Sequence, residues 1–293
     1  MANNLDQIRL GVAAAEAIVG SAPEMAKLDA FATRLDELVD ARGDRIFVPV
    51  FSGVEASTWN ESTNNYATAD GDINGKPVVL DQHLKATVSA SDLELTTTAL
   101  KSLSEAAQAY GKAVALGVLG SVYAKVTASN YQASTTLSAS AAETEAAWFG
   151  LYAAAVDSGL NPTECALTLN PAYYAKLLAL QKWATTGDGD GPRAGSIPSW
   201  VGFRSVHCAT NLPASENLVG FVSHRSAMAV ASAPIKPASS DVDYTVGTDP
   251  QTGVNIGVRS NYDKAKGRLY LTFETLAGSA VCRGDSLLRI VSA

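Results

Sequence analysis

A long apolar stripe at helical spacing is the feature that most constrains how this chain folds. Its members recur every three or four residues, and they are Leu100, Leu103, Ala107, Tyr110, Val114, Val118 and Val122. The run Ser91-Asp-Leu-Glu94 has the form of a capping box, so the helix is expected to begin there. A helix of about 33 residues would be about 50 Å long, which exceeds the diameter of a small domain and predicts a spine. Gly111, Gly117 and Gly120 in its second half permit close approach of another backbone.

The first 40 residues carry two further helical patterns. The first is an apolar stripe that needs a partner surface, and its members are Leu5, Ile8, Val12, Ala15 and Val19. The run Ser21-Ala-Pro-Glu24 then predicts the start of a second helix, with the stripe Met25, Leu28, Phe31, Leu35 and Leu38. Acidic residues interrupt the first segment, so it is interpreted as an amphipathic helix and not as a signal peptide. Both helices must lie along the rest of the protein or along another copy.

A polar stretch between two β-rich segments predicts an extended arm. Residues 45–50 form a short strand pattern in which Pro49 suits a sheet edge, and residues 80–88 alternate as a half-exposed strand does. Between them, Ser52 to Lys76 are rich in Ser, Thr, Asn and Gly and have almost no aliphatic pattern. Connections of this length in compact domains are usually functional or disordered. The two strands are therefore expected to form a long hairpin-like arm that serves a partner.

The remainder of the chain predicts an α/β lobe followed by a β-rich end. Ser140-Ala-Ala-Glu143 is expected to cap a helix that ends near Gly159, and Asn170-Pro171 is expected to begin another helix. Residues 185–196 are interpreted as a flexible loop. Strands are expected at residues 165–169, 200–208, 218–222, 254–258, 269–275 and 287–291.

Sparse charge is the main compositional signal. Charged residues make up 17% of the 293-residue chain, against roughly 25% in average globular proteins, and the formal net charge is −7. A surface with so little charge either is poorly soluble or is covered by other subunits. The acidic balance argues against binding nucleic acid through a basic face. The longest apolar run, residues 113–126, is shorter than the roughly 20 residues that span a bilayer.

One motif suggests a metal site. Asp70-Gly-Asp72-Ile-Asn74-Gly75 matches the first six positions of an EF-hand calcium loop. Asp81 stands where the bidentate Glu is normal, Pro77 stands where an aliphatic residue is normal, and neither flank is helical. The favoured interpretation is a hairpin turn at Asn74-Gly75, with calcium as the alternative.

No other constellation points to chemistry. The three histidines show no metal-ligand spacing, and the sequence contains no GxSxG, Walker or GxGxxG motif. The three cysteines are far apart and are expected to be small buried apolar residues in a reducing compartment. Two Arg-Gly-Asp triplets, at 42–44 and 283–285, are expected to be chance turns, and the acidic pairs Glu143/Glu145 and Glu94/Glu105 are expected on solvated helix faces. No catalytic, cofactor-binding or metal-binding residue is therefore predicted.

The order of these parts resembles that of the major capsid proteins of tailed bacteriophages. Those subunits have an N-terminal arm, an extended E-loop, a peripheral domain with a long spine helix, and an α/β axial domain. The resemblance extends over nearly the whole chain, and it is carried by residues 76–85 leading into 91–94, by 165–171, by 201–206 followed by 211–213, and by 219–228.

The resemblance implies an α+β fold with definite parts. These are an N-terminal arm at 1–43, an E-loop at 44–90, a peripheral domain with the spine helix at 91–128, an axial domain at 129–240, and a returning β segment of the peripheral domain at 241–293. The E-loop would reach over a neighbouring subunit, and the 185–196 loop would lie at the capsomer centre. Some members of the family form Lys–Asn cross-links, but Lys76 and Lys85 do not match the cross-linking motif.

The function implied is structural and not enzymatic. The chain would assemble with itself into hexamers and pentamers of an icosahedral phage head that encloses double-stranded DNA without sequence-specific binding. Scaffolding, portal and decoration proteins would be separate chains, no membrane is involved, no cofactor is expected, and assembly would take place in the cytoplasm of the bacterial host. The alternatives are an encapsulin-like compartment shell and, in another class, a soluble α/β enzyme.

Overall fold

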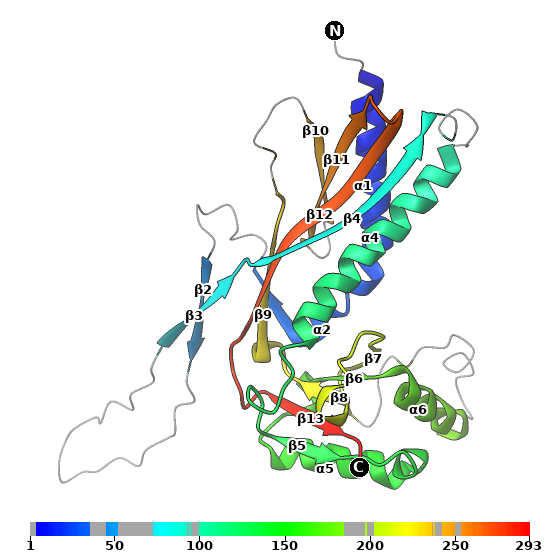
Figure 1. The fold of residues 1–293 in the computed structure, drawn as a ribbon. Helices are drawn as coiled ribbons and strands as arrows, with labels where there is room; N and C mark the ends of the chain where they lie inside the picture. Colours follow the sequence, from blue (N-terminus) through cyan, green and yellow to red (C-terminus); the bar gives the residue numbers. More distant parts are fainter. Residues whose placement is uncertain are drawn as a thin grey trace, which may run out of the picture.

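The structure is a computed structural model that describes residues 4–35, 45–51, 73–92, 94, 100–184, 197, 202–235, 237, 242–249 and 253–293. These residues form an elongated lobe on a six-stranded sheet and a compact lobe on a five-stranded sheet (Figure 1). A two-stranded hairpin projects from the side of the elongated lobe (Figure 1). The mixed α+β architecture expected from the sequence is confirmed.

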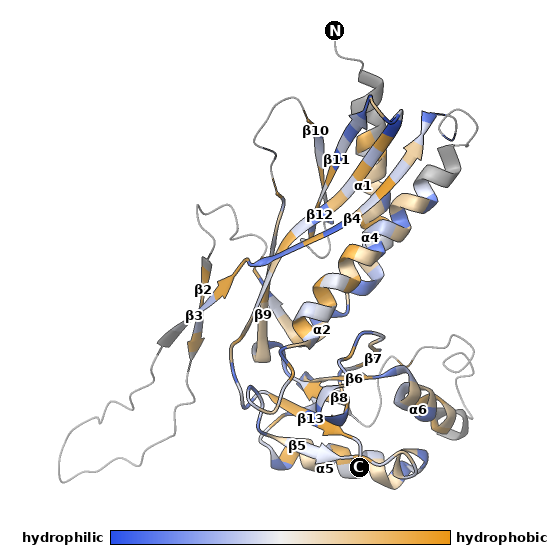
Figure 2. Ribbon diagram, viewed as in Figure 1, coloured by the Kyte–Doolittle hydropathy of each residue, from blue (hydrophilic) through white to orange (hydrophobic). Residues whose placement is uncertain are grey.

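The elongated lobe is a sheet with two long helices on one face. Its strand order is β1-β9-β12-β11-β10, and β4 pairs with β12. The first half of β12 lies between β4 and β11, and its second half pairs with β9. The strands are β1 (Ala32–Arg34), β4 (Gln82–Ser91), β9 (Met228–Ala233), β10 (Asp243–Thr248), β11 (Asn255–Asp263) and β12 (Arg268–Val281). The helices are α1 (Asn4–Met25) and α4 (Leu100–Tyr123), and hydrophobic residues gather toward the C-terminal half of α4 (Figure 2).

The spine helix exists but is shorter than expected. α4 has 24 residues, so it extends over about 36 Å. The capping box does form, because the Glu94 carboxylate accepts a hydrogen bond from the Ser91 backbone N–H at 2.7 Å and the Ser91 hydroxyl accepts one from Glu94 N–H at 3.3 Å. Asp92 and Glu94, directly after β4, are helical, and α4 is described from Leu100; residues 93 and 95–99 lie outside the described residues. β4 pairs with β12 as far as Ser91, which is the residue predicted to cap the helix.

Two N-terminal helices form, but the second begins later and is much shorter than predicted. α1 continues through Pro23 to Met25, and the Ser21 hydroxyl donates to the Ile18 carbonyl at 3.0 Å, so Ser21 is not a helix cap. After it come only the four-residue helix α2 (Leu28–Phe31) and β1, which pairs with β9. Residue 38 of the expected second stripe lies outside the described residues. Pairing with a sheet edge therefore overrides the helical spacing.

The buried face of α1 also differs from the expected one. Between the buried Leu10 and Met25, the buried side chains of α1 are all small ones, namely Ala13, Ala14, Ala17 and Ser21. Val12 and Val19, from the stripe expected to be buried, are 54% and 60% exposed. The reason is close packing, because a Cβ added at Gly20 would collide with the Gln108 backbone and one added at Gly111 with the Ala17 backbone. Only small side chains allow the two helices to approach so closely.

The hairpin uses a different second strand from the one expected. β2 (Arg45–Phe51) is the predicted edge strand, and it pairs antiparallel with β3 (Ile73–Val79). The alternating segment predicted as its partner is β4, which instead pairs along its whole length with β12. Leu84, Ala86 and Val88 of β4 pack against the core, so the predicted alternation is confirmed, but it serves the large sheet.

The compact lobe follows the sequence closely. Its sheet order is β5-β13-β8-β6-β7, made from β5 (Ser134–Thr136), β6 (Ala166–Leu169), β7 (Ser205–Cys208), β8 (Leu218–Ser223) and β13 (Leu287–Val291). The helices α5 (Glu145–Asp157) and α6 (Pro171–Ala184) pack on one face of this sheet. Asn170 caps α6 as predicted, since its side-chain oxygen accepts from Tyr173 N–H at 2.9 Å. Gly159 ends α5 with a φ of +83°, again as predicted.

Several details of this lobe differ from expectation. α5 begins at Glu145, and Ser140 makes no side-chain cap; residues after it form a short 3₁₀ turn instead. The strand expected at 200–208 is described only over β7, and the 185–196 loop lies outside the described residues. The 3₁₀ helices are η2 (Ala141–Glu143), η3 (Pro162–Glu164), η4 (Ser215–Asn217) and η5 (Arg225–Ala227).

The chain crosses between the two sheets at positions that the expected domain ranges do not anticipate. β9, within the range 129–240, pairs with β12 and β1 of the elongated lobe. β13, within the range 241–293, pairs with β8 and β5 of the compact lobe. Within the described ranges, no helix is both long and apolar enough to cross a membrane.

We expect Gly111→Ala to destabilise the unassembled chain by about 2 kcal/mol or more, because the new methyl group overpacks the contact between α1 and α4. Gly120→Ala on the same helix is the matched control. A Cβ there meets nothing within 4 Å, so this variant is expected to be up to about 1 kcal/mol more stable. Urea unfolding of both variants measures the difference, and equal midpoints would contradict the close contact.

Candidate functional site

The three histidines lie at three separate places. His83 Nε2 is 3.1 Å from Glu274 Oε2, His207 Nε2 is 2.9 Å from Ser205 Oγ, and His224 Nδ1 is 2.8 Å from Ser226 Oγ. Burial, together with Lys27 and Arg204 nearby, lowers the pKa of His207. No group of three or more His, Cys, Asp or Glu residues in the described part of the chain could hold a metal ion.

The cysteines are free thiols with raised pKa values. Cys165 is buried, whereas Cys208 and Cys282 are partly exposed, so the expectation of burial is confirmed fully only for Cys165. Burial, with a smaller contribution from Glu164, raises the pKa of Cys165 to about 11. A thiol with such a pKa is almost entirely protonated at neutral pH and is a poor nucleophile.

The structure corrects both interpretations of the EF-hand-like motif. Asn74 and Gly75 lie inside β3, paired with Val50 and Pro49, so they form neither a hairpin turn nor the sharp turn of a calcium loop. Asp70 and Asp72 lie outside the described residues. The pairing of β2 with β3 holds this backbone extended, which a local turn signal cannot reveal.

The remaining polar motifs have local partners. Arg283 Nη2 lies 2.8 Å from Asp285 Oδ2, and this contact lowers the pKa of Asp285. The two charged residues of the second Arg-Gly-Asp triplet therefore pair with each other. The first triplet is outside the described residues. Glu143 Oε1 pairs with Lys176 Nζ at 3.1 Å, and Glu94 is held by Ser91. None of these groups is brought together with another to form a reactive site.

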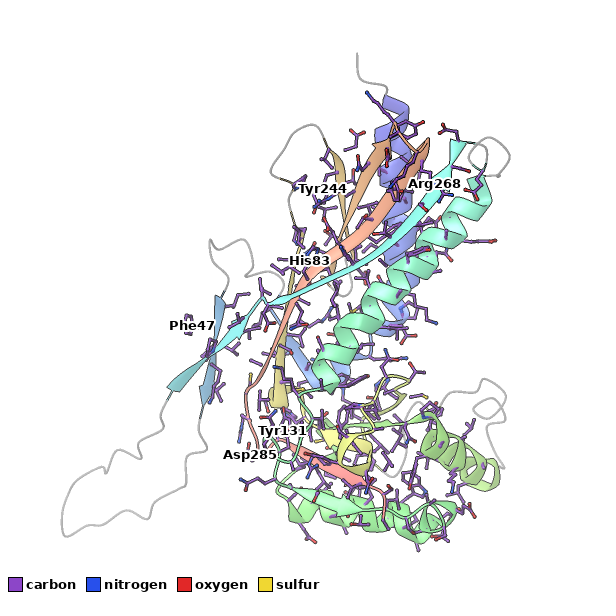
Figure 3. All side chains as sticks on the ribbon, viewed as in Figure 1. Phe47, His83, Tyr131, Tyr244, Arg268 and Asp285 are labelled. Carbon is purple, nitrogen blue, oxygen red and sulfur yellow. The ribbon has the colours of Figure 1, made fainter. Side chains whose placement is uncertain are left out.

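The hairpin presents an apolar outer face. Phe47 is 65% exposed, and Figure 3 places it on the side of the hairpin away from the two lobes. Its paired residue is Pro77, and the next pair on this face is Pro49 with Gly75. Proline has no N–H, so the two prolines remove donors that an open edge would otherwise offer to a further strand. The edges of the hairpin are thus poorly suited to pairing with a further strand, whereas its apolar outer face can make side-chain contacts.

The inner face of the hairpin is anchored to the elongated lobe. Ile46, Val48 and Val78 form a small core with residues of β9, among them Ala229 and Ala231. The backbone of β3 crosses β12 at Gly278, where an added Cβ would collide with the Val79 carbonyl. This crossing fixes the direction in which the hairpin leaves the sheet.

A buried carboxylate ties the strand that follows the hairpin to the sheet. The Glu274 side chain of β12 is 3% exposed, and its two oxygens contact His83 of β4 at 3.1 Å and Arg259 of β11 at 2.5 Å. These three residues lie on the sheet face opposite the helices, because Leu271 and Phe273 of β12 face the helical core. Sequence spacing gives no sign of this cluster, since only the strand pairing brings its members together.

Other large apolar side chains are exposed far from the hairpin. They are Val12 and Val19 on α1, Phe149 and Val156 on α5, and Tyr262 on β11. With Phe47, they leave apolar surface on both lobes and on the hairpin. Single exposed apolar side chains are ordinary on folded proteins, so only those that lie together on one face carry an argument.

Comparison with known proteins identifies the fold. No protein-family model matches the chain, and no curated protein matches it. Among solved structures, one from Mycobacterium phage Che8 is 17% identical, with 91% of this chain and 90% of the other covered and a TM-score of 0.58. The capsid structure of the Cyanophage P-SCSP1u is 14% identical, with 89% and 86% covered and a TM-score of 0.58. A virus-like particle from Pyrococcus furiosus is 14% identical, with 95% and 97% covered and a TM-score of 0.56.

These likenesses extend over nearly the whole of each chain. At such low identities they show the fold alone, which is that of the tailed-phage major capsid proteins. The resemblance inferred from the order of the sequence elements is therefore confirmed at the level of fold.

We expect Glu274→Ala to destabilise the unassembled chain by about 2 kcal/mol, because it leaves the half-buried Arg259 without its carboxylate. Glu105→Ala, an exposed position on α4, is the control and is expected to change stability by less than about 0.5 kcal/mol. Chemical unfolding measures both. An unchanged midpoint for Glu274→Ala would show that the cluster does not hold β4.

We expect the Cys165 thiol to resist alkylation in the folded chain at pH 8, because a pKa of about 11 leaves well under a hundredth of it as thiolate. Iodoacetamide labelling followed by peptide mass spectrometry measures this, with the denatured chain as the control. Rapid modification of Cys165 under native conditions would contradict the assigned burial.

Proposed function

We propose that this chain is a major capsid protein that assembles into an icosahedral phage head enclosing double-stranded DNA. The observation that carries the proposal is the capsid fold along about nine-tenths of the chain, together with a projecting hairpin whose outer face is apolar. The outer face of this hairpin is exposed in its own subunit, so contact with a neighbour would offset the cost of ordering it. The work of such a protein is geometric and not catalytic.

The parts of the chain are assigned to roles on this basis. Residues 1–43 act as the N-terminal arm and 44–90 as the E-loop, of which β2 and β3 are the root. Residues 91–128 and 241–293 make the peripheral domain, and 129–240 make the axial domain, with β9 and β13 exchanged between the two sheets. The 185–196 loop is assigned to the capsomer centre.

Charge supports the enclosure of DNA. The net charge of −7 keeps an inner wall from adhering to packaged DNA, which must be able to leave the particle. Scaffolding, portal and decoration proteins are assigned to separate chains. Assembly takes place in the cytoplasm of a bacterial host, and the finished protein is part of the virion.

A compartment shell of the encapsulin type is the second candidate. The virus-like particle from Pyrococcus furiosus matches this chain over 95% of its length with a TM-score of 0.56, close to the value for the phage capsid. Such a shell would enclose cargo protein in place of a genome. The fold serves both, so the contents of the particle separate them.

Electron microscopy of particles purified from producing cells tests the proposal. Closed shells tens of nanometres across are expected, with nuclease-resistant double-stranded DNA inside; shells that hold protein and no DNA would favour the compartment. A monomer or small oligomer at all concentrations would contradict both and favour a soluble enzyme.

Phe47→Asp is the matched variant for this experiment. It is expected to lower the yield of shells about tenfold or more, because it places a charge on the apolar face of the hairpin. The unassembled chain should unfold at an unchanged temperature, since Phe47 is exposed. Phe47→Leu keeps the face apolar and is expected to retain most of the yield.

A further inference from the structure

The helix α5 is apolar on every side. Between Glu145 and Asp157, no residue carries a charged, amide, serine or threonine side chain. Trp148, Leu151 and Ala155 face the core of the compact lobe, which is the burial that a single chain can provide. A helix that is apolar all round is normally buried all round. Half of α5 is therefore left without the cover that its composition requires.

The uncovered half of α5 is a continuous face. Phe149 is 56% exposed and Val156 is 48% exposed, and the exposed residues between and before them are Ala146, Gly150 and Ala153. Beside this face lies a hollow of about 240 Å³ between α5 and β5, lined by Thr135, Leu137 and Gly150 among others. The helix face is thus apolar, and the hollow beside it has a mixed polar and apolar lining.

Unpaired carboxylates mark the two ends of this face. Glu145 begins α5 and Asp157 ends it, both are exposed, and neither has an ion-pair partner among the residues that the structure describes. A two-fold contact of α5 with α5 of another copy would bring Glu145 of one helix toward Asp157 of the other. Like charges brought together in this way are destabilising. The charges at α5 therefore favour a different, cationic surface.

The opposite edge of the same sheet carries an unpaired cation. β5 and β7 are the two edge strands of the five-stranded sheet; α5 lies beside β5, whereas α6 contacts β7 (Figure 1). Arg204, next to β7, is exposed and has no ion-pair partner within the described ranges. One lobe thus has an acid-flanked apolar face at one edge and an exposed arginine at the other.

We infer that the exposed face of α5 docks against the β7 edge of the compact lobe of a second copy of this chain, with Arg204 of that copy meeting Glu145 or Asp157. Contact between two different patches of identical chains is head-to-tail, and when repeated around an axis it closes a ring. The inference rests on the proposed function, because a shell is built from such rings, and it names the surfaces that make them.

The size of the face agrees with this occupant. A stable isolated pair of proteins buries about 800 Å² on each partner. The face of one 13-residue helix, about 20 Å long, is too small for that alone. In a ring, the α5 contact forms between every pair of neighbouring copies, and its buried area adds to the area buried by the hairpin contacts. Such a contact would therefore hold a ring and not an isolated dimer.

Phe149→Asp tests the apolar part of the contact. We expect the fraction of chain found in rings and shells, measured by sedimentation and electron microscopy, to fall about tenfold or more. Phe149→Met is the control and should assemble as the unaltered chain does. Circular dichroism and the unfolding temperature of the unassembled variants should match, because Phe149 is exposed.

A charge exchange tests the partner surface. Arg204→Glu alone and the pair Glu145→Lys with Asp157→Lys are each expected to lower assembly severalfold, and the triple variant is expected to restore most of it. Lys264→Glu changes the same charge on the elongated lobe and should have no effect on ring formation. Only a direct contact between the two surfaces predicts the rescue, so folding defects of single variants cannot imitate it.

The outcomes separate this inference from the proposed function. Wild-type shells together with full assembly of Phe149→Asp would overturn the α5 contact and leave the capsid function standing; the face would then belong to another protein or to solvent. Reduced assembly without rescue by the charge exchange would overturn the β7 edge as partner. A wild-type chain that never assembles would overturn both proposals.

Discussion

The close contact between α1 and α4 determines how a large part of the elongated lobe is packed. At Gly20 and Gly111 the two helix backbones lie so near that no side chain fits between them. This contact selects the small-residue face of α1 for burial and turns Val12 and Val19 outward. It also lays both helices along the six-stranded sheet, whose residues Leu271 and Phe273 complete the core. A single packing constraint thus gives the elongated lobe its shape and leaves two valines of α1 exposed.

The junction between the two lobes is packed against the end of this helix pair. Phe31 of α2 and Tyr123 at the end of α4 stack with centroids 5.5 Å apart, and Phe221 of β8 meets Phe31 edge-on at 5.4 Å. The Tyr131 hydroxyl, at the same junction (Figure 3), donates to the Ala227 carbonyl at 2.9 Å. An aromatic cluster buried between two sheets resists bending. A subunit of this kind can present its hairpin and its helix faces to neighbours in a defined geometry.

Local signals succeeded where one segment decides its own structure. Asn170-Pro171 begins α6 and Gly159 ends α5, because a cap or a positive φ depends on the residues present at that point. Signals failed where a distant strand competed. The helical spacing gave way after Phe31 to β1, which pairs with β9, and the Asn74-Gly75 turn gave way to β3, which pairs with β2. A periodic pattern shows that a face is apolar, but it does not show which partner covers it.

The sequence by itself determined the order of the parts, the spine helix, the capsid-like layout and the lack of a recognisable reactive motif. These follow from spacing, capping and composition, which are properties of short segments. Only the tertiary structure decided that β4 belongs to the large sheet, that Glu274 joins His83 to Arg259, and that α5 keeps an uncovered apolar face. Each depends on residues far apart in the chain, and strand pairing and helix packing are what bring such residues into contact.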